Sequence, residues 1–525
     1  MTVIPLPLIA PPVFGYAEMH YRFKYFFSYL KKHEPEILAD APHRLEPGAN
    51  LPVLLFVKDA HLYPVTIHSV VAHLRTSDEG SRQTISLIVD QQTMTQKFWW
   101  HVAQIPMKEF CGDYAGPLFV DIEFSYSVKG KIRQCVNDNY RTSSKQPLRI
   151  YRSAASLPTL PGWIAGDAHT HSWHTEDQVE FGSPTAASVI LSKAMGLSFF
   201  CVTDHSYDID DREDNYLLND PAKPKWIRLQ DECDNINAEE KSFAVVRGEE
   251  VSCWNDASRN VHLLLYGTRR FFPGSGDSAE RWFQTRSELT IPDVLREKDA
   301  AVAAYAAHPL EGVPFLHRLF FGRGSWGLTD MAAPGLTGLQ IANGERTSAF
   351  VEGLAVWKSF LLKGCRLFIA AGNDAHGNFN RYRQLGIPFF TIAEADRQLF
   401  GRMRTAVQAA NVSEENIVAA LREGHSCITN GPIGVLSRSA GVVTVSAVSS
   451  LEFGPLQTLR VYSGTVGDAE ERLLSEFSPA GLCYFSGSVH LHSPLPSYVR
   501  LEVATSAGAN CSDGFCFTNP LWISS

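Results

Sequence analysis

The sequence predicts a central α/β domain between two β-rich regions. Between residues 161 and 432, helical patterns alternate with short apolar runs, an order typical of a parallel sheet covered by helices. Residues 1–160 and 433–525 instead contain short runs of β-branched and aromatic residues separated by turns. A stretch with two prolines, Arg152 to Gly162, reads as a linker. The length of 525 residues fits the three domains that these boundaries define.

The first region reads as an Ig-like β-sandwich and the last as a second β-rich domain. Turns such as Asp78-Glu-Gly divide the first region into strands expected at Leu51–Asp59, Val65–Leu74, Thr84–Val89 and Phe119–Val128. The strands of the last region are expected at Val442–Val448, Gln457–Tyr462, Gly487–Leu491 and Tyr498–Ala504. An aromatic and basic segment, Tyr21–Lys32, is expected to form a short helix. Because neither region carries evident chemistry, both are candidates for a cover over the central domain, an extended substrate site or a homo-oligomer interface.

In the central region, helical periodicity marks the helices and short buried runs mark the strands that follow them. The helices are expected at Pro184–Met195, Pro292–Ala300 and Val351–Leu362. The strands are expected at Leu197–Thr203, Phe243–Arg247, Ala301–Ala307 and Arg366–Ala371. Histidines and carboxylates cluster after these strands. Since the loops at the carboxyl ends of the strands converge in a β/α barrel, we expect the clusters to meet at one mouth.

Composition limits the classes of partner and compartment. The formal charge of -9, with 45% hydrophobic and 20% charged residues, fits an ordinary globular protein and argues against a nucleic-acid partner. No segment reaches the ~18 apolar residues of a membrane helix, and the Pro-rich start is a poor signal peptide. The ten cysteines lack C-x-x-C spacing, as expected of reduced thiols. We therefore expect a cytoplasmic protein that acts on a small molecule, without a membrane partner.

Two histidines at positions i and i+2 form the first part of a predicted metal site. His169 and His171 follow a strand-like segment, and alternate residues of a strand point to the same face. Histidine and carboxylate side chains bind borderline divalent ions such as zinc, manganese and iron. The pair alone is a weak signal, because this spacing is common by chance. Its weight comes from downstream partners, which are His205, Glu250, His262, His308, Asp374 and His376.

Some downstream candidates also have ordinary structural interpretations. The tripeptide Thr203-Asp-His offers His205 as a ligand and Asp204 as the neighbour that orients it, but Asp204 is equally a helix cap. Glu250, favoured over the adjacent Glu249, is a carboxylate that can bridge two cations. A lone histidine on an apolar strand, such as His262, is more often a core residue. The candidates gain weight only as a set.

These blocks, in this order, resemble the PHP superfamily, named for polymerase and histidinol phosphatase. The matching blocks, spread over residues 162–430, are Asp167-Ala-His-Thr-His, Val202-Thr-Asp-His, Gly248-Glu-Glu-Val, Val261-His-Leu-Leu, Ala307-His-Pro and Asn373-Asp-Ala-His. Further segments, including Gln340-Ile-Ala-Asn-Gly and the stretch from Ala419 to Pro432, are similar to its carbaryl-hydrolase-like (CehA/McbA) branch. The resemblance implies a distorted (β/α)7 barrel with metals on its C-terminal face.

The resemblance also implies ligands for two to three divalent ions (Zn, Mn or Fe). The first ion would take His169, His171, Glu250 and Asp374. The second would share Glu250 and add His262 and His308. The third would take His205, His376 and one residue of the loop after His171, where spacing favours Asp177 over His174.

The predicted function is hydrolysis by a metal-activated water. A divalent ion lowers the pKa of bound water from ~15.7 towards 7. The catalytic candidates are His174, which would protonate the leaving group, Asp204 and Glu250. A phosphate substrate needs cations, for which Arg346, Arg381 and Arg383 are candidates. We favour a phosphoesterase. The alternatives are a carboxylester, amide or carbamate hydrolase of the carbaryl-hydrolase type, and a non-catalytic metal-binding assembly module.

Overall fold

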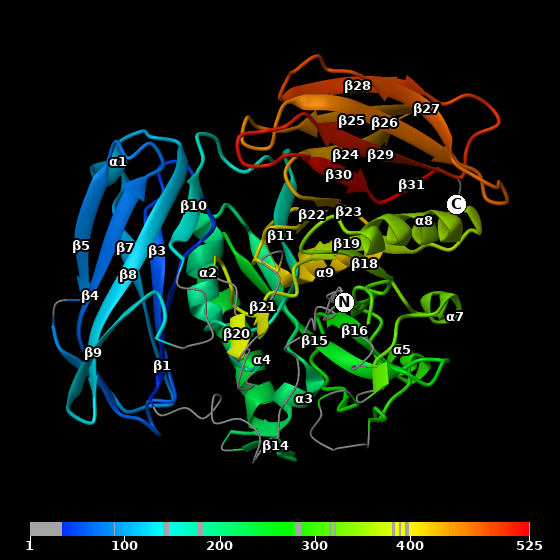
Figure 1. Cartoon of the computed structure of the whole chain (residues 1–525). Helices are drawn as coiled ribbons and strands as arrows, with labels where there is room; N and C mark the ends of the chain where they lie inside the picture. The colour runs from blue at the N-terminus through cyan, green and yellow to red at the C-terminus, as the bar shows by residue number, and fades with distance from the viewer. Residues whose placement is uncertain are drawn as a thin grey trace, which may run out of the picture.

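A computed structural model describes most of the chain, in three regions that follow one another along the sequence (Figure 1). The described residues are 34–88, 90–139, 146–175, 182–213, 215–276, 278, 285–313, 318–319, 322–380, 384–387, 390–393, 398–439 and 441–523. The helix expected at Tyr21–Lys32 lies outside them. In the view of Figure 1 the first region lies at the left, the last at the top, and the central region between them.

Two sheets enclose the core of the N-terminal region. The smaller has the order β1-β3-β7, and the larger has the order β2-β10-β8-β4-β5, with β6 paired to β4 and β9 to β8. Buried residues alternate with more exposed ones along β4 and β8, so one face of each strand packs inward. The strands are β1 (Glu36–Asp40), β2 (Arg44–Leu45), β3 (Leu51–Lys58), β4 (Val65–Thr76), β5 (Arg82–Ile88), β6 (Gln92–Met94), β7 (Phe98–Ile105), β8 (Gly116–Val128), β9 (Lys131–Val136) and β10 (Leu148–Arg152), with the short helix α1 (Met107–Cys111) after β7.

One large mixed sheet runs through the central region and on into the C-terminal region. Its order is β19-β18-β17-β16-β15-β12-β11-β22-β23-β30-β29-β26-β27, with β31 paired to β29. Its central strands are β11 (Trp163–Thr170), β12 (Phe199–Val202), β15 (Ala244–Trp254), β16 (Asn260–Tyr266), β17 (Ala303–Ala306), β18 (Gly338–Asn343), β19 (Phe368–Gly372), β22 (Arg404–Gln408) and β23 (Ser426–Thr429). The edge of β19 approaches β11, where Asp374 N donates to His169 O at 2.9 Å. This approach brings the two ends of the central region together.

The prediction of a distorted (β/α)7 barrel is wrong. Strands make up 42% of the structure and helices 16%, whereas the barrel needs a helix after every strand. β15 instead turns directly into β16, and β16 pairs antiparallel with both β15 and β17. β22 and β23 also pair antiparallel and connect the sheet to the C-terminal strand β30 (Phe515–Thr518). In a hairpin, two neighbouring strands satisfy each other's backbone hydrogen bonds without a crossover helix. The apolar pattern of these strands does not distinguish a hairpin from a parallel pair that a helix connects.

The helices of the central region lie close to their expected positions. α2 (Thr185–Ala194), α5 (Ile291–Glu297) and α8 (Ser348–Leu362) correspond to the three expected helices. Thr290 and Asp293 form a capping box at the start of α5. The remaining helices and short strands are α3 (Ser206–Ile209), α4 (Pro224–Glu239), α7 (Leu328–Met331), α9 (Glu414–Glu423), β13 (Asp211–Arg212), β14 (Asn215–Asn219), β20 (Gln384–Ile387) and β21 (Phe390–Ala393). Local sequence patterns therefore predicted these three helices, whereas they did not predict which strands pair.

The C-terminal strands are divided between the large sheet and a separate three-stranded sheet. The large sheet includes β26 (Leu456–Gly464), β27 (Arg472–Phe477), β29 (Tyr498–Thr505), β30 and β31 (Leu521–Trp522). The separate sheet contains β24 (Ile433–Ser439), β25 (Val442–Val448) and β28 (Tyr484–His490). Buried residues of both sheets share one core cluster. Hydrogen bonding thus continues across residue 432, the boundary expected from sequence.

Buried polar contacts join the N-terminal region to the other two. The Asp40 carboxylate, at the end of β1, accepts from the backbone N–H groups of Phe379 (2.8 Å) and Asn380 (3.1 Å). The Arg44 guanidinium donates from Nε to both oxygens of Glu452 at 3.0 Å. Each carboxylate accepts hydrogen bonds from buried donors. Removing one partner would leave a buried charge uncompensated, which destabilises the folded state. The N-terminal region is therefore fixed against the segment that follows Asp374 and His376.

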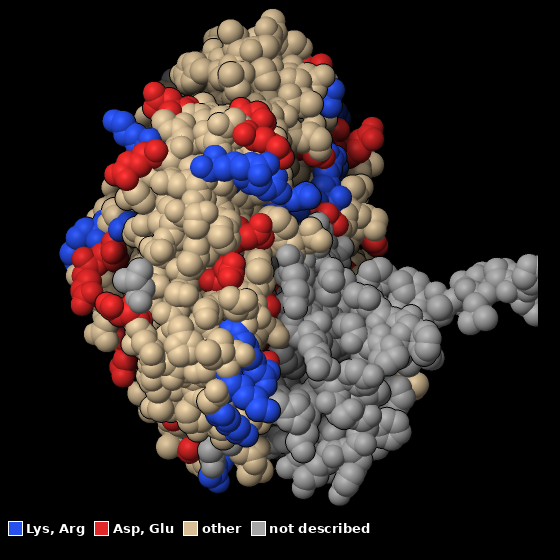
Figure 2. All heavy atoms as spheres, turned by 60° about the vertical axis from the view of Figure 1, so that its left-hand side comes forward, with Lys and Arg blue, Asp and Glu red and all other residues tan. Residues whose placement is uncertain are grey.

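On the face shown in Figure 2, Lys and Arg are interspersed with Asp and Glu. Among the described residues, none of the helices has both the length and the apolar composition needed to cross a membrane. All ten cysteines are free thiols.

Candidate metal centre

Six strands carry the candidate ligands to one place. β11 contains His169 and leads into His171, β15 contains Glu250, and β16 contains His262. His205, His308 and the pair Asp374 and His376 directly follow β12, β17 and β19. Their side chains are buried, and His308 is the most exposed at 11%. Glu250 was expected just after a strand but lies within β15, and His262 lies on a strand as expected; the two face the site from within one antiparallel hairpin.

The tightest group contains His169, His171, Glu250 and Asp374. His169 Nε2 lies 3.0 Å from Glu250 Oε2 and 3.3 Å from Asp374 Oδ1. His171 Nε2 lies 3.3 Å from the same Glu250 oxygen and 3.0 Å from the same Asp374 oxygen. The two imidazole nitrogens are 3.3 Å apart. Four donor atoms thus surround one point.

The Glu250 carboxylate faces different histidines with its two oxygens. Oε2 lies near His169, His171 and also His205, whose Nδ1 is 3.2 Å away. Oε1 lies 2.8 Å from His262 Nδ1 and 3.4 Å from His308 Nε2. His205, Glu250 and His262 form a second group of donor atoms within 4.8 Å of one another. Glu250 is therefore placed to bridge two sites, as a shared carboxylate does in two-metal centres.

A third group is made of imidazoles alone. The donor atoms of His171, His205 and His376 lie within 4.8 Å of one another. The rings of His171 and His376 stack, with centroids 4.1 Å apart and an interplanar angle of 7°. The structure thus pairs His205 and His376 as expected for the third ion, but it adds His171. It places His205 in the second group as well, where the resemblance implied His308.

Backbone strain occurs at two of the candidate ligands. His308 has φ 29° and Asp374 has φ 53°, values in the left-handed region that side chains other than glycine rarely adopt. Such conformations persist only where surrounding contacts fix them, and they cluster at functional sites. Gly372 permits a close approach of the backbone to His169, because a Cβ at position 372 would lie 2.4 Å from His169 Cβ.

Burial and neighbouring charges both shift the pKa values of the cluster. Burial raises the pKa of Glu250, but His169, His262 and His205 outweigh it and hold that pKa well below its usual value. Burial lowers the pKa of His169, yet Glu250 and Asp374 outweigh it, so the pKa is raised. For His205, burial and then His171 lower the pKa well below the usual value. In the protein alone the cluster therefore keeps ionised carboxylates beside both charged and neutral imidazoles.

Hydrogen bonds from the far side of three rings fix their tautomers. His169 Nδ1–H donates to Gln340 Oε1 at 2.9 Å, and His376 Nδ1–H donates to the Asp374 carbonyl at 3.1 Å. His171 Nδ1–H faces Thr175 Oγ1 at 3.4 Å. In its neutral form, each ring then presents the lone pair of Nε2. For His169 and His171 this lone pair points at the first group, and metal-bound histidines use such outer partners for orientation.

Asp204 supports the site in a different way from the one expected. Its carboxylate accepts from Ser172 N (2.7 Å), Ser172 Oγ (2.6 Å) and Thr175 Oγ1 (2.8 Å). Neither ring nitrogen of His205 makes a hydrogen bond to any described residue, so Asp204 does not orient that imidazole. It instead fixes the loop that follows His171.

Several other predicted residues are not brought to the cluster. His174 Nε2 faces Glu232 Oε2 at 3.2 Å, and His174 belongs to none of the donor groups among the described residues. The Arg346 guanidinium lies over the rings of Phe350 and Phe515, 5.9 and 5.8 Å from their centroids. Asp177, Arg381 and Arg383 lie outside the described residues.

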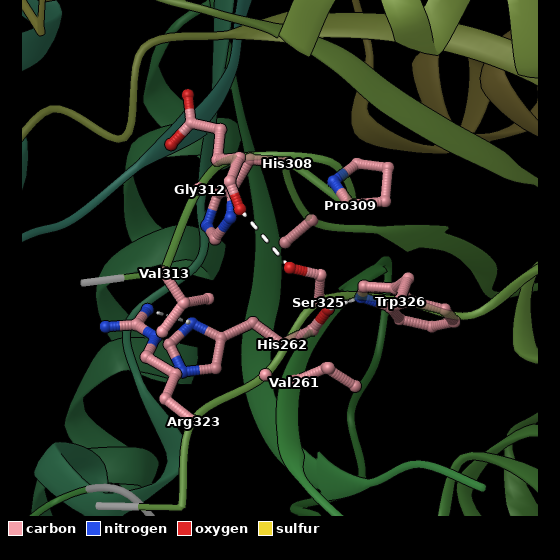
Figure 3. A pocket seen from close by; sticks show the side chains of 12 residues that line it. Val261, His262, His308, Pro309, Gly312, Val313, Arg323, Ser325 and Trp326 are labelled. Atoms are coloured by element: carbon pink, nitrogen blue, oxygen red, sulfur yellow. Dashed lines mark hydrogen bonds between the residues drawn. The ribbon is translucent and has the colours of Figure 1, made fainter. Parts of the chain in front are cut away.

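An arginine that sequence reasoning missed lies beside the cluster. Arg323 Nη2 is 3.3 Å from His262 Nδ1, and both residues line a pocket of about 40 Å³ together with His308 (Figure 3). Its segment, Gly322-Arg-Gly, follows no predicted strand and matches none of the family blocks. Its flanking glycines were a signal for an unusual backbone: Gly322 has φ 65°. Gln340 belongs to a block that is similar to the carbaryl-hydrolase-like branch, but its role was missed, because an uncharged amide in a strand carries no sign of a role at a metal site.

The donor geometry fits a divalent ion. Tetrahedral bonds of 2.0–2.2 Å would separate neighbouring donor atoms by roughly 3.3–3.6 Å. In the first group, the imidazole nitrogens lie 3.0–3.3 Å from each other and from the carboxylate oxygens. Two Nε2 lone pairs at that distance from each other and from carboxylate oxygens repel, unless a cation or proton lies between them. The buried groups can thus hold metal ions.

Comparison with known proteins adds only distant likeness. No family model and no curated protein matches the chain. A β-D-mannosidase from Dictyoglomus thermophilum is 6% identical with a TM-score of 0.23, over 92% of this chain and 66% of that one. A Paenibacillus cycloisomaltooligosaccharide glucanotransferase is 9% identical with a TM-score of 0.18, over 93% of this chain and 71% of that one. TM-scores this low support no inference about function, so the proposed function depends on the geometry of the site.

Proposed function

We propose that this protein is a metal-dependent hydrolase of phosphate esters, related to the carbaryl-hydrolase-like branch of the PHP superfamily. The observation that carries the proposal is the Glu250 carboxylate, whose two oxygens face separate sets of histidines. The order of the sequence blocks supports the family assignment. Replacing a buried ion pair by well-packed apolar residues is often neutral or stabilising. Stability of the fold therefore does not require a buried carboxylate among so many imidazoles, which favours a functional role.

The residues that would hold the metals follow from the donor groups. One ion would take His169, His171, Glu250 and Asp374, and a second would share Glu250 with His205 and His262. A third position among His171, His205 and His376 competes with these for two imidazoles. Bound divalent ions supply a water of lowered pKa and neutralise developing negative charge.

The protein's own residues divide the remaining tasks. Gln340 and Thr175 hold protons at Nδ1 of His169 and His171, which keeps both Nε2 atoms available. Burial of the ligands excludes bulk water from all but the side lined by His308. Arg323 lies on that side and offers N–H donors to an anionic substrate oxygen, which favours a phosphate ester over a neutral ester.

Metal analysis and a matched substrate pair test the proposal. The purified protein is stripped with a chelator, reloaded with Mn or Zn, and assayed on p-nitrophenyl phosphate and p-nitrophenyl acetate. We expect metal-dependent turnover of the phosphate, lost in Asp374→Asn. Turnover of the acetate alone would instead support the ester, amide or carbamate hydrolase. No turnover of either, despite full loading, would support a metal-binding assembly module.

A further inference from the structure

The Asp204 carboxylate is buried beside the candidate ligands without belonging to any of their groups. Asp204 lies just beyond the end of β12, is 0% exposed, and is a member of none of the donor groups among the described residues. Its backbone is bonded to β15, because Glu250 N donates to Asp204 O at 3.0 Å. Its side chain accepts from the segment after His171, at Ser172 and Thr175. One residue thus joins the strand that carries Glu250 to the loop that follows His171.

The hydrogen bonds around Asp204 run towards its carboxylate. Ser172 N, 2.7 Å from Asp204 Oδ1, is a backbone N–H and can only donate. Ser172 Oγ lies 2.6 Å from Oδ2 and itself accepts from His174 N at 3.2 Å, so its own proton is available to Asp204. The Thr175 hydroxyl lies 2.8 Å from Oδ1. Because an ionised carboxylate has lone pairs but no proton, the single hydroxyl proton of Thr175 points to Asp204.

The direction of this hydroxyl determines how Thr175 interacts with His171. Thr175 Oγ1 lies 3.4 Å from His171 Nδ1, and both side chains are buried, at 3% and 2% exposure. With its proton directed at Asp204, the hydroxyl offers only lone pairs to the imidazole. The ring therefore carries a proton on Nδ1. Its other nitrogen, Nε2, is then left to face the oxygens of Glu250 and Asp374 in the first donor group.

We infer that Asp204 is a positioning residue for His171 and acts on it through the Thr175 hydroxyl. The chain of carboxylate, hydroxyl and imidazole holds the ring orientation and the proton at Nδ1, as outer partners of metal-bound histidines do. The carboxylate strengthens this chain, because charged acceptors form stronger hydrogen bonds and successive bonds polarise one another. The inference rests on the metal centre of the proposed function, but not on the class of substrate.

The zinc affinity of two Thr175 variants tests the inference, measured by titrating the zinc-loaded, full-length protein with a chromophoric chelator. Thr175→Val has nearly the same shape but no hydroxyl. It should bind zinc about 10-fold more weakly, at the low end of the range for outer partners because the bond to the ring is long. Thr175→Ser keeps the hydroxyl and should bind within about 3-fold of the unaltered protein. The absorption bands of the cobalt-loaded protein report ligand geometry, and they should shift in Thr175→Val and return in Thr175→Ser.

Thr505→Val is the matched control for loss of a buried hydroxyl. Thr505 is 6% exposed and donates to Phe453 O at 2.6 Å in the C-terminal region. In its metal-free form this variant should melt at a lower temperature, yet it should bind zinc normally. The control separates a loss of stability from a loss of metal affinity.

A double-mutant cycle tests whether Asp204 acts through Thr175. Asp204→Asn should weaken zinc binding on the order of 5-fold, because a neutral amide is a weaker acceptor than a carboxylate. In the Thr175→Val background the same substitution should add less than about 2-fold.

Two results would overturn the inference and leave the hydrolase proposal intact. One is full additivity of the two substitutions in zinc affinity. The other is zinc binding by Thr175→Val within about 3-fold of the unaltered protein, which decides the question even if Asp204→Asn does not fold. Failure of the unaltered protein to bind zinc would instead refute the metal centre itself, and the inference with it.

Discussion

The hydrogen bond between His169 and Gln340 offers a direct test of how the first donor group is held. Gln340 Oε1 accepts from His169 Nδ1 at 2.9 Å, and both side chains are fully buried. Gln340 Nε2 in turn donates to Ala342 O and Asn343 Oδ1, each at 3.3 Å. The Gln340→Leu variant keeps a similar volume but removes the acceptor. His169 then loses the partner that places its proton on Nδ1 and its lone pair on Nε2.

The expected magnitude follows from the cost of an unsatisfied buried donor. Leaving the His169 N–H without an acceptor costs about 1–3 kcal/mol, which corresponds to a change of roughly 5- to 150-fold in an equilibrium constant. Loss of such outer partners in known metal sites weakens binding by about 10–100-fold. We therefore expect Gln340→Leu to bind Zn on the order of 10–100-fold more weakly, with all direct ligands intact.

Competition of the stripped protein with a chromophoric zinc chelator measures this affinity. Gln83→Leu, at an exposed position of β5, is the control for the same substitution and should bind zinc like the unaltered protein. The melting temperature of the metal-free variant reports separately on folding. If Gln340→Leu binds zinc within 3-fold of the unaltered protein while its metal-free form melts lower, then Gln340 has a packing role only and the reasoning fails.

Three further predictions concern the anion contact, acid stability and metal removal. Arg323→Met should raise KM for p-nitrophenyl phosphate about 10-fold and leave p-nitrophenyl acetate unaffected; a parallel change for both esters would contradict a role in anion binding. Burial, then Arg402 and Arg404, lower the pKa of His43 to about 3, against about 6.5 when unfolded. The contribution of the neutral His43 ring to the free energy of unfolding is therefore complete above pH 6.5. It is lost as the pH falls towards 3, and about 1–2 kcal/mol is gone by pH 5. His43→Gln should narrow the gap between urea midpoints at pH 7.5 and 5.0, and an unchanged gap would count against this assignment. Chelation should lower the melting temperature, because ions at 100 times their Kd stabilise the folded state by about 2.7 kcal/mol; unchanged melting after proven metal loss would show that the cluster does not bind metal in the folded protein.

Local pattern predicted the elements better than it predicted their pairing. The helix expected at Val351–Leu362 is present as α8, and the strand expected at Arg366–Ala371 is present as β19. The antiparallel hairpin of β15 and β16 was missed, because buried strands have the same apolar composition in parallel and antiparallel sheets. The residues 161–432 were therefore assigned a barrel of repeated strand–helix units that the structure does not have.

The candidate site was more predictable than the fold. His169, His171, Glu250 and Asp374 were candidates because their chemistry is explicit in their side chains, and the structure places the imidazole nitrogens 3.0–3.3 Å from the carboxylate oxygens. The grouping itself came from a family resemblance, since spacing along the chain does not say which distant residues meet.

By itself, the sequence determined which side chains are able to bind a cation and which segments form helices or strands, because these properties depend on residue type and near neighbours. Only the tertiary structure decided that β15 and β16 form a hairpin, that Gln340 and Arg323 lie beside the histidines, and that His174 faces Glu232. The physical reason is that contacts between distant segments are selected by the packing of the whole chain, which no local pattern records.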